Sequence, residues 1–125
     1  MNKVLATKKA PAAIGPYSQG IEANGMVFVS GQLAIIPETG ELCTGTIAEQ
    51  TAQSMNNIAN ILAEAGCTWE NVVKTTIFLK DLANFAEVNA AYAKFFTGAA
   101  PARACVQVAK LPKDADLEIE AIAVK

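Results

Sequence analysis

Residues alternate between two chemically distinct faces in two stretches near the end of the chain, 103–109 and 117–124. Such alternation is typical of a β-strand, because successive side chains point to opposite sides of a sheet. The pattern therefore predicts two strands. One face of the first carries Arg103, Cys105 and Gln107. One face of the second carries Glu118 and Glu120.

Further strands are predicted earlier in the chain. Residues 72–79 are rich in β-branched side chains, which favour strands. Residues 26–30 form a predicted strand that ends at Gly31, and residues 33–36 form its continuation or the next strand. The sequence Pro-Glu-Thr-Gly over 37–40 is typical of a turn.

Between Thr46 and Gly66, apolar residues recur at every third or fourth position, which predicts an amphipathic helix. Thr46 followed by Glu49 matches the capping-box pattern of a helix N-terminus, and Gly66 suits the position after the C-terminus. The predicted buried stripe is entirely apolar and consists of Ala48, Ala52, Met55, Ala59 and Leu62, widened by Ile58, Ile61 and Ala65.

A second helix is predicted between Asn84 and Gly98. Asn84 with Glu87 repeats the capping pattern, and Gly98 is expected to end the helix. Its predicted buried stripe is largely aromatic and consists of Phe85, Val88, Tyr92, Phe95 and Phe96.

This order of elements indicates a single α+β domain over residues 1–125, built as a two-layer sandwich. Two helices are expected to cover one face of a mixed six-stranded sheet. The other face would still need cover, and a partner subunit is the simplest source. The composition points the same way, because 52% of the residues are hydrophobic and only 18% are charged, which leaves few charges to cover a monomer.

The chain contains no histidine, which excludes Ser-His-Asp triads, Cys-His pairs and His-containing zinc sites. A net charge of −2 argues against a nucleic-acid-binding function, which needs a basic surface. The three cysteines form no CxxC pair, which fits a reducing compartment. Residues 1–13 lack the apolar core of a secretory signal, and no apolar stretch is long enough to span a membrane. We therefore expect a soluble cytoplasmic domain.

Polar side chains within the apolar strands are the main candidates for chemistry. Arg103 and the pair Glu118 and Glu120 allow two interpretations. They could form a solvated strand face or an Arg-Glu pair at a subunit contact. Alternatively, they could line a cleft in which Arg103 binds a carboxylate and a glutamate moves a proton. Spacing alone does not distinguish Glu118 from Glu120, because the two share a face.

Five other positions are candidates with a structural alternative. Cys105 is more typical of a small buried residue than of a nucleophile, because no histidine is available to activate it. The Tyr17 hydroxyl could contact a ligand, or its ring could pack on the core. Ser30 and Gly31, at a strand end, could offer backbone N–H groups to an anion. Asn89 could face solvent or reach into a site.

Seven motifs occur in order along the chain. They are A-P-A-A-I-G-P-Y-S-Q-G (10–20), V-S-G-Q (29–32), V-V-K-T-T-I-F-L-K-D-L (72–82), V-N-A-A-Y-A-K-F-F (88–96), P-A-R-A-C-V-Q-V (101–108), L-P-K (111–113) and E-I-E-A-I-A (118–123). Together they closely resemble the RidA/YjgF family of reactive-intermediate deaminases, and the resemblance extends from about residue 4 to residue 124.

The resemblance implies a chorismate-mutase-like α+β domain that assembles as a homotrimer. The three sheets would form a central barrel, with clefts between subunits. It also implies hydrolysis of 2-imino acids, such as 2-iminobutanoate and 2-iminopropanoate, to 2-keto acids and ammonia. The implied reaction needs no cofactor and no metal.

The resemblance also implies roles for individual residues by their positions in the motifs. Arg103 would grip the substrate carboxylate, and Glu118 would position the attacking water. Cys105 would contribute its backbone carbonyl to holding that water. The remaining matched positions would line the cleft and are Tyr17, Ser30, Gly31 and Asn89.

Two other functions stay open at this point. A non-catalytic trimer that binds small keto acids or related metabolites would need Arg103 but not Glu118. An RNA-cleaving or translation-inhibiting activity is also ascribed to members of the family. The negative net charge and the scattered Lys and Arg residues argue against the second of these.

Overall fold

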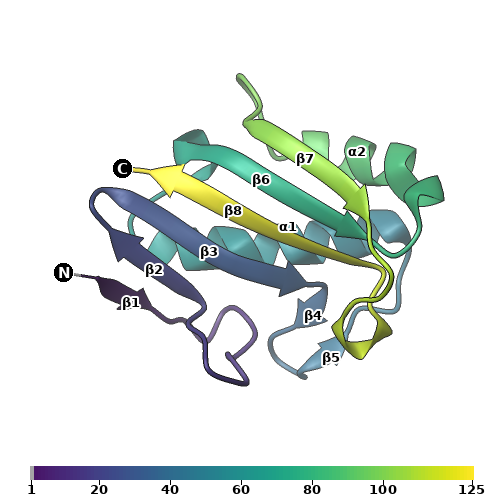
Figure 1. Ribbon diagram of the computed structural model, residues 1–125, viewed down its shortest axis with the longest axis horizontal. Coiled ribbons are helices and arrows are strands. Elements are labelled where there is room, and N and C mark those ends of the chain that lie inside the picture. The colour runs from purple at the N-terminus through teal and green to yellow at the C-terminus, as the bar shows by residue number, and fades with distance from the viewer. Residues whose placement is uncertain (1) are drawn as a thin grey trace.

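The computed structural model describes residues 2–125, which form a six-stranded sheet with two helices packed on one face (Figure 1). The sheet order is β1-β2-β3-β8-β6-β7. Strands β6 and β7 pair in parallel, and all other pairs are antiparallel. The strands span Lys3–Leu5 (β1), Gly20–Ala23 (β2), Met26–Leu33 (β3), Val72–Leu79 (β6), Ala102–Gln107 (β7) and Leu117–Val124 (β8). The predicted α+β architecture is confirmed.

The helices and the smaller elements lie between these strands in the sequence. The helices span Ile47–Glu64 (α1) and Phe85–Ala93 (α2). A separate two-stranded sheet pairs β4 (Ile35–Ile36) with β5 (Glu41–Leu42) around the predicted turn. Short 3-10 turns span Trp69–Asn71 (η1), Leu82–Asn84 (η2) and Pro112–Asp114 (η3). No helix within residues 2–125 has both the length and the apolar character that a membrane span requires.

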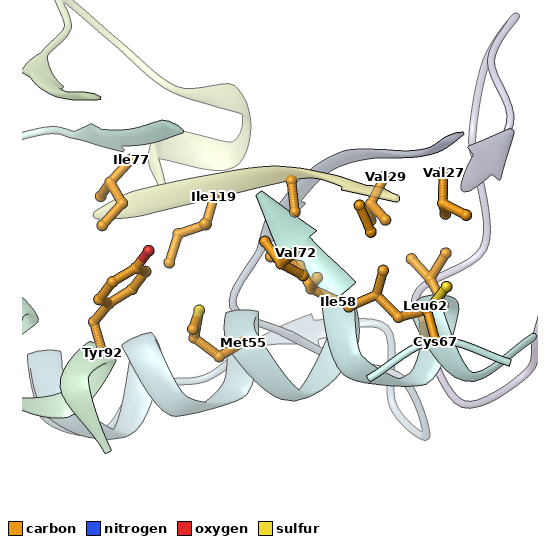
Figure 2. Packing of buried hydrophobic residues seen from close by; sticks show 14 of the residues in the cluster. Val27, Val29, Met55, Ile58, Leu62, Cys67, Val72, Ile77, Tyr92 and Ile119 are labelled. Atoms are coloured by element: carbon orange, nitrogen blue, oxygen red, sulfur yellow. The ribbon is translucent and has the colours of Figure 1, made fainter. Parts of the chain in front are cut away.

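The main core lies between α1 and the sheet. Met55, Ile58 and Leu62 rise from α1 toward the strands (Figure 2). They meet the inward side chains of the strands, among them Val29 and Ile119. Burial of these apolar side chains is the main favourable term that holds the helix on the sheet.

Both ends of α1 form as predicted. The Thr46 side chain accepts a hydrogen bond from the Glu49 amide, and the Thr46 amide donates to Glu49 Oε1, each at 3.1 Å. This reciprocal pair satisfies two N–H groups that have no partner within the helix. At the other end, Gly66 adopts a φ of 73°, a left-handed conformation that glycine tolerates without strain.

The predicted buried stripe of α1 is wrong in one respect. Ala48, Ala52 and Ala59 lie at the margin of the buried face and are only partly covered. Three polar residues are fully buried along with the large apolar side chains, and these are Thr51, Ser54 and Asn57. Buried polar groups are tolerated when they find hydrogen-bond partners, and those partners cannot be read from the helix sequence alone.

The predicted boundaries of α2 are also corrected. Asn84 makes no side-chain capping bond, because it ends the preceding turn η2, whose own cap is the Asp81 side chain. The Glu87 carboxylate instead accepts a hydrogen bond from the Ala48 amide of α1, at 3.3 Å. The helix ends at Ala93 rather than near Gly98. Phe95 and Phe96 follow it and pack their rings against Trp69.

The first two strands of the sheet were not predicted individually. β1 and β2 contain only three and four residues, which is too short for a clear alternation to appear. They pair with each other and extend the sheet beyond β3.

The second face of the sheet has no helix over it (Figure 1). Several apolar side chains remain exposed there, including Phe28, Val106 and Val124, each about 40% exposed. An apolar sheet face of this kind is typical of an interaction surface.

We expect Thr46→Ala to lower the free energy of unfolding by about 1 kcal/mol, because it removes one half of the capping box of α1. Urea unfolding at fixed protein concentration would show a lower midpoint with an unchanged slope. Thr44→Ala is the matched control, since Thr44 is exposed and precedes the cap. Equal midpoints for the two variants would contradict the prediction.

Candidate functional site

A pocket of about 740 Å³ opens where β3 and β8 meet the loop before β2. Four of the predicted site residues line it together, and these are Tyr17, Ser30, Gly31 and Glu118. Glu120 and Lys113 also line it, and apolar side chains such as Ile14 and Leu33 complete its wall. The pocket therefore combines acidic groups with an apolar surface.

An irregularity in β3 shapes this pocket. The register between β3 and β8 shifts between Val29 and Gln32, so Ser30 and Gly31 leave the regular ladder. Ser30 anchors the neighbouring loop, since its hydroxyl donates to the Ser18 carbonyl at 2.6 Å and its amide to the Gln19 carbonyl at 2.9 Å. These bonds place Tyr17, the residue before Ser18, at the rim of the pocket. Bulges of this kind are common beside active sites, where they redirect side chains.

Gly31 leaves room for the Glu118 side chain, which lies against its backbone. A Cβ atom at position 31 would lie 2.7 Å from Glu118 Oε1, closer than non-bonded atoms approach. Glycine at this position therefore allows a close contact between backbone and side chain, and it does not adopt an unusual backbone conformation. It lets the carboxylate of Glu118 pack directly on β3.

Burial raises the pKa of the Glu118 carboxyl above its ordinary value of 4.5, and the nearby Glu120 raises it further. Desolvation and a like charge both disfavour the ionised form of a carboxyl group. Glu118 is half-buried, whereas Glu120 is exposed. The pocket thus raises the proton affinity of Glu118, and a shifted pKa is a common property of general acids and bases.

Arg103 and Asn89 lie in a second pocket, of about 670 Å³, between α2 and the start of β7. Arg103 Nη1 donates to Asn89 Oδ1 at 2.7 Å. The guanidinium carbon lies 5.1 Å from the ring centre of Tyr92 and 5.6 Å from that of Phe85. Cation–π contacts and one amide oxygen therefore fix the side chain.

No carboxylate within residues 2–125 forms a salt bridge with Arg103. Its positive charge is therefore available to an anion, and a planar guanidinium can hold a carboxylate through two parallel hydrogen bonds. Sequence reasoning assigned Tyr92 to the core and missed its contact with Arg103. The Tyr92 hydroxyl points toward the sheet (Figure 2) and shares a hydrogen bond of 2.6 Å with Thr75. That bond locks the ring on which the guanidinium rests.

The Cys105 side chain faces the helices and packs partly against the main core. Burial raises the pKa of its thiol, although the Arg103 charge acts in the opposite direction. A thiol that holds its proton is a weak nucleophile. The Cys105 side chain is half-buried, and the role of this residue stays a prediction.

Arg103 and Glu118 point to opposite faces of the sheet. Arg103 pairs in register with Thr75 on β6, and Glu118 pairs with Phe78. Positions 75 and 78 are an odd number of residues apart, so their side chains point in opposite directions. In addition, β6 separates β7 from β8, which places the two backbones about 10 Å apart. Within one chain, no small substrate can contact both groups.

The described residues offer no obvious place for a metal ion. Among residues 2–125, no cluster of three or more His, Cys, Asp or Glu side chains could hold one. The side chains that line the two pockets offer a guanidinium, carboxylates, the Lys113 ammonium, hydroxyls and an amide.

Comparison with known proteins gives full-length matches. The family model described as Endoribonuclease L-PSP matches residues 7–125. The chain is 51% identical to the 2-iminobutanoate/2-iminopropanoate deaminase of Escherichia coli, with 100% of this chain and 99% of that protein covered.

Solved structures match equally well. A putative endoribonuclease from Thermotoga maritima superimposes with a TM-score of 0.97 at 48% identity, covering 100% of this chain and 98% of that one. E. coli TdcF with bound serine superimposes with a TM-score of 0.94 at 45% identity, covering 98% of each chain. On these matches, the chain belongs to the RidA/YjgF family, the group that the Endoribonuclease L-PSP model describes.

Proposed function

We propose that this protein hydrolyses reactive 2-imino acids, such as 2-iminobutanoate and 2-iminopropanoate, to 2-keto acids and ammonia. The observation that carries the proposal is the pair of complementary half-sites. One holds an arginine that forms no salt bridge with a carboxylate in the described part of the chain, and the other holds a glutamate with a raised pKa. The identity of 51% to the E. coli deaminase over the whole chain supports it.

The proposal includes assembly of the site between chains. Arg103 of one copy would meet Glu118 of another, because one chain separates them by a sheet face and a strand. The exposed apolar face around Phe28 and Val124 would be covered in the same assembly. A closed ring of three copies places the same contact at each boundary, so all three sites would be complete.

Arg103 would bind and orient the substrate. A 2-imino acid is a small anion, and its carboxylate matches the planar guanidinium. Asn89, Tyr92 and Phe85 hold that guanidinium in place before the substrate arrives, which lowers the entropic cost of a productive geometry. TdcF binds serine, whose carboxylate could be recognised in the same way.

Glu118 would act on the attacking water. The ionised carboxylate accepts a proton as the water oxygen forms a bond to the C=N carbon, and the π electrons move to nitrogen. The nitrogen, which is protonated in the substrate imine, becomes the amine of a carbinolamine and takes up the proton that Glu118 accepted. The C–N bond then breaks and ammonia leaves, while the hydroxyl proton passes to the Glu118 carboxylate, and from there to ammonia or solvent, as the C=O bond forms. One water is consumed for each keto acid and ammonia produced, so the reaction needs no external oxidant or reductant.

The other predicted residues would line the assembled cleft. Tyr17, Ser30 and Gly31 already surround Glu118, and the Cys105 backbone carbonyl would help to hold the water. The absence of a cofactor stays a prediction of the resemblance, and a cytoplasmic location stays a prediction from the sequence.

We expect Glu118→Gln to lower kcat/KM by about 10²–10⁴-fold, because the amide cannot accept a proton from water. The assay generates 2-iminobutanoate with an amino-acid oxidase and measures how far the protein suppresses trapping by semicarbazide. Glu120→Gln is the matched control and should retain most of the activity. If Glu118→Gln retains activity and Glu120→Gln loses it, the catalytic role belongs to Glu120. If the wild-type protein never suppresses trapping but binds keto acids, the protein is a binder rather than an enzyme.

Mixing two inactive variants tests assembly between chains. Arg103→Ala and Glu118→Gln are each expected to be inactive. After they are unfolded together and refolded in equal amounts, about a quarter of the sites should combine an intact arginine with an intact glutamate, because neighbouring chains supply them. Recovery of about that share of wild-type activity supports the shared site, and no recovery despite mixed trimers refutes it. Wild-type protein carried through the same procedure is the control.

The pH profile should reflect the raised pKa of Glu118. Activity requires the carboxylate, so kcat/KM should fall as the pH drops through a value above 4.5. Glu120→Gln removes the neighbouring negative charge and should move this acid limb to lower pH. Glu64→Gln is the control, since it makes the same charge change at the exposed end of α1. An acid limb that stays in place in Glu120→Gln would contradict the prediction.

A further inference from the structure

Helix α1 carries a stripe of three polar side chains, Ser54, Asn57 and Asn60, spaced three residues apart on one side of the helix. Each donates a hydrogen bond to a backbone carbonyl of another segment. Ser54 Oγ lies 2.7 Å from the Gln32 carbonyl oxygen. Asn57 Nδ2 lies 3.3 Å from the Leu33 oxygen and 2.9 Å from the Ile35 oxygen. None of these bonds belongs to the helix or to a sheet ladder.

The carbonyls that Ser54 and Asn57 hold come from the irregular end of β3. The register shift before Gln32 and the break between β3 and β4 disturb the regular pairing there. A buried carbonyl without a partner is costly, so such groups are almost always bonded. Both side chains are fully buried, and Gln53 Nε2 donates to Asn57 Oδ1 at 3.0 Å, which fixes the orientation of the amide.

The other side of this segment faces the pocket of about 740 Å³ that Glu118 and Glu120 line, here called the acidic pocket. Ser30 and Gly31 lie within the shifted register, and Gly31 forms the surface on which the Glu118 carboxylate rests. A small displacement of this backbone would alter both the packing and the exposure of Glu118. Hydrogen bonds from α1 to one side of this segment therefore affect the position of Glu118 on its other side.

We propose that Ser54 and Asn57 are positioning residues, which hold the bulge of β3 so that Ser30 and Gly31 present Glu118 to the substrate. The catalytic part of this inference depends on the proposed deaminase function. The structural part, that these two side chains set the environment of Glu118, does not.

Asn60 extends the same arrangement to the N-terminal loop. Its Nδ2 donates to the Lys9 carbonyl at 2.8 Å. From the other side, the buried Gln19 amide donates to the carbonyls of Thr7, Ala10 and Pro11. Pro11 and Ala12 line the acidic pocket, so Asn60 and Gln19 together hold the loop that forms this part of its wall.

The test uses Ser54→Ala and Asn57→Leu, with Thr51→Val as the matched control. Thr51 is equally buried on the same helix, but its hydroxyl donates to the Ile47 carbonyl of its own helix, at 2.8 Å. We expect Asn57→Leu to lower kcat about 10²-fold, with a much smaller change in KM, because the Arg103 half-site is untouched. Ser54→Ala should lower kcat about tenfold, for loss of a single bond. Thr51→Val should leave both constants unchanged.

A second readout does not need activity. The pKa of Glu118, followed by carbon NMR of its labelled carboxyl group, should fall toward the ordinary value in Ser54→Ala, because a relaxed bulge admits water. The other charged groups at this pocket, Glu120 and Lys113, are unchanged in all the variants. Thr51→Val should keep the wild-type titration.

The outcomes separate the two proposals. If the wild-type protein lacks deaminase activity, the proposed function fails, and the Glu118 titration alone decides the positioning role. Should Asn57→Leu fail to fold, Ser54→Ala decides it. A folded Ser54→Ala protein with wild-type kcat and a wild-type Glu118 titration overturns the inference, as does a Thr51→Val protein that shows the same changes.

Discussion

The two-residue period of a β-strand is the constraint on which the arrangement of the two pockets depends. Because side chains alternate between faces, Arg103 lies on the helix side of the sheet and Glu118 on the open side. The fold therefore separates Arg103, with its aromatic and amide contacts, from Glu118 and its pocket. In the proposed function, the first supplies anion binding, the second supplies proton transfer, and a complete site needs both.

The elements of this arrangement that depend on neighbouring residues can be predicted from the sequence. Alternation correctly predicts the strand at Leu117–Val124, and a capping box correctly predicts the start of α1. The alternation also places Arg103 and Cys105 on one face of their strand, and Glu118 and Glu120 on one face of theirs. These predictions succeed because each depends only on residues within a few positions of one another.

The relation between the two half-sites could not be predicted in this way. Strands β7 and β8 are consecutive in the sequence, yet β6 lies between them, parallel to one and antiparallel to the other. Strand order and register decide which face of β7 matches which face of β8. The buried Ser54 and Asn57 escaped prediction for the same reason, since their partners are carbonyls more than 20 residues away, which hydrophobic patterning does not reveal.

The contacts of Arg103 have a consequence for how the protein responds to its surroundings. Its neighbours are an amide, a phenylalanine ring and a tyrosine whose pKa burial raises above 10.0. None of them changes charge near neutral pH, and arginine itself stays protonated. The charge at the Arg103 pocket is thus constant across the physiological range. In the proposed function, a change in acidity would therefore alter proton transfer at Glu118 and leave binding of the substrate carboxylate unchanged.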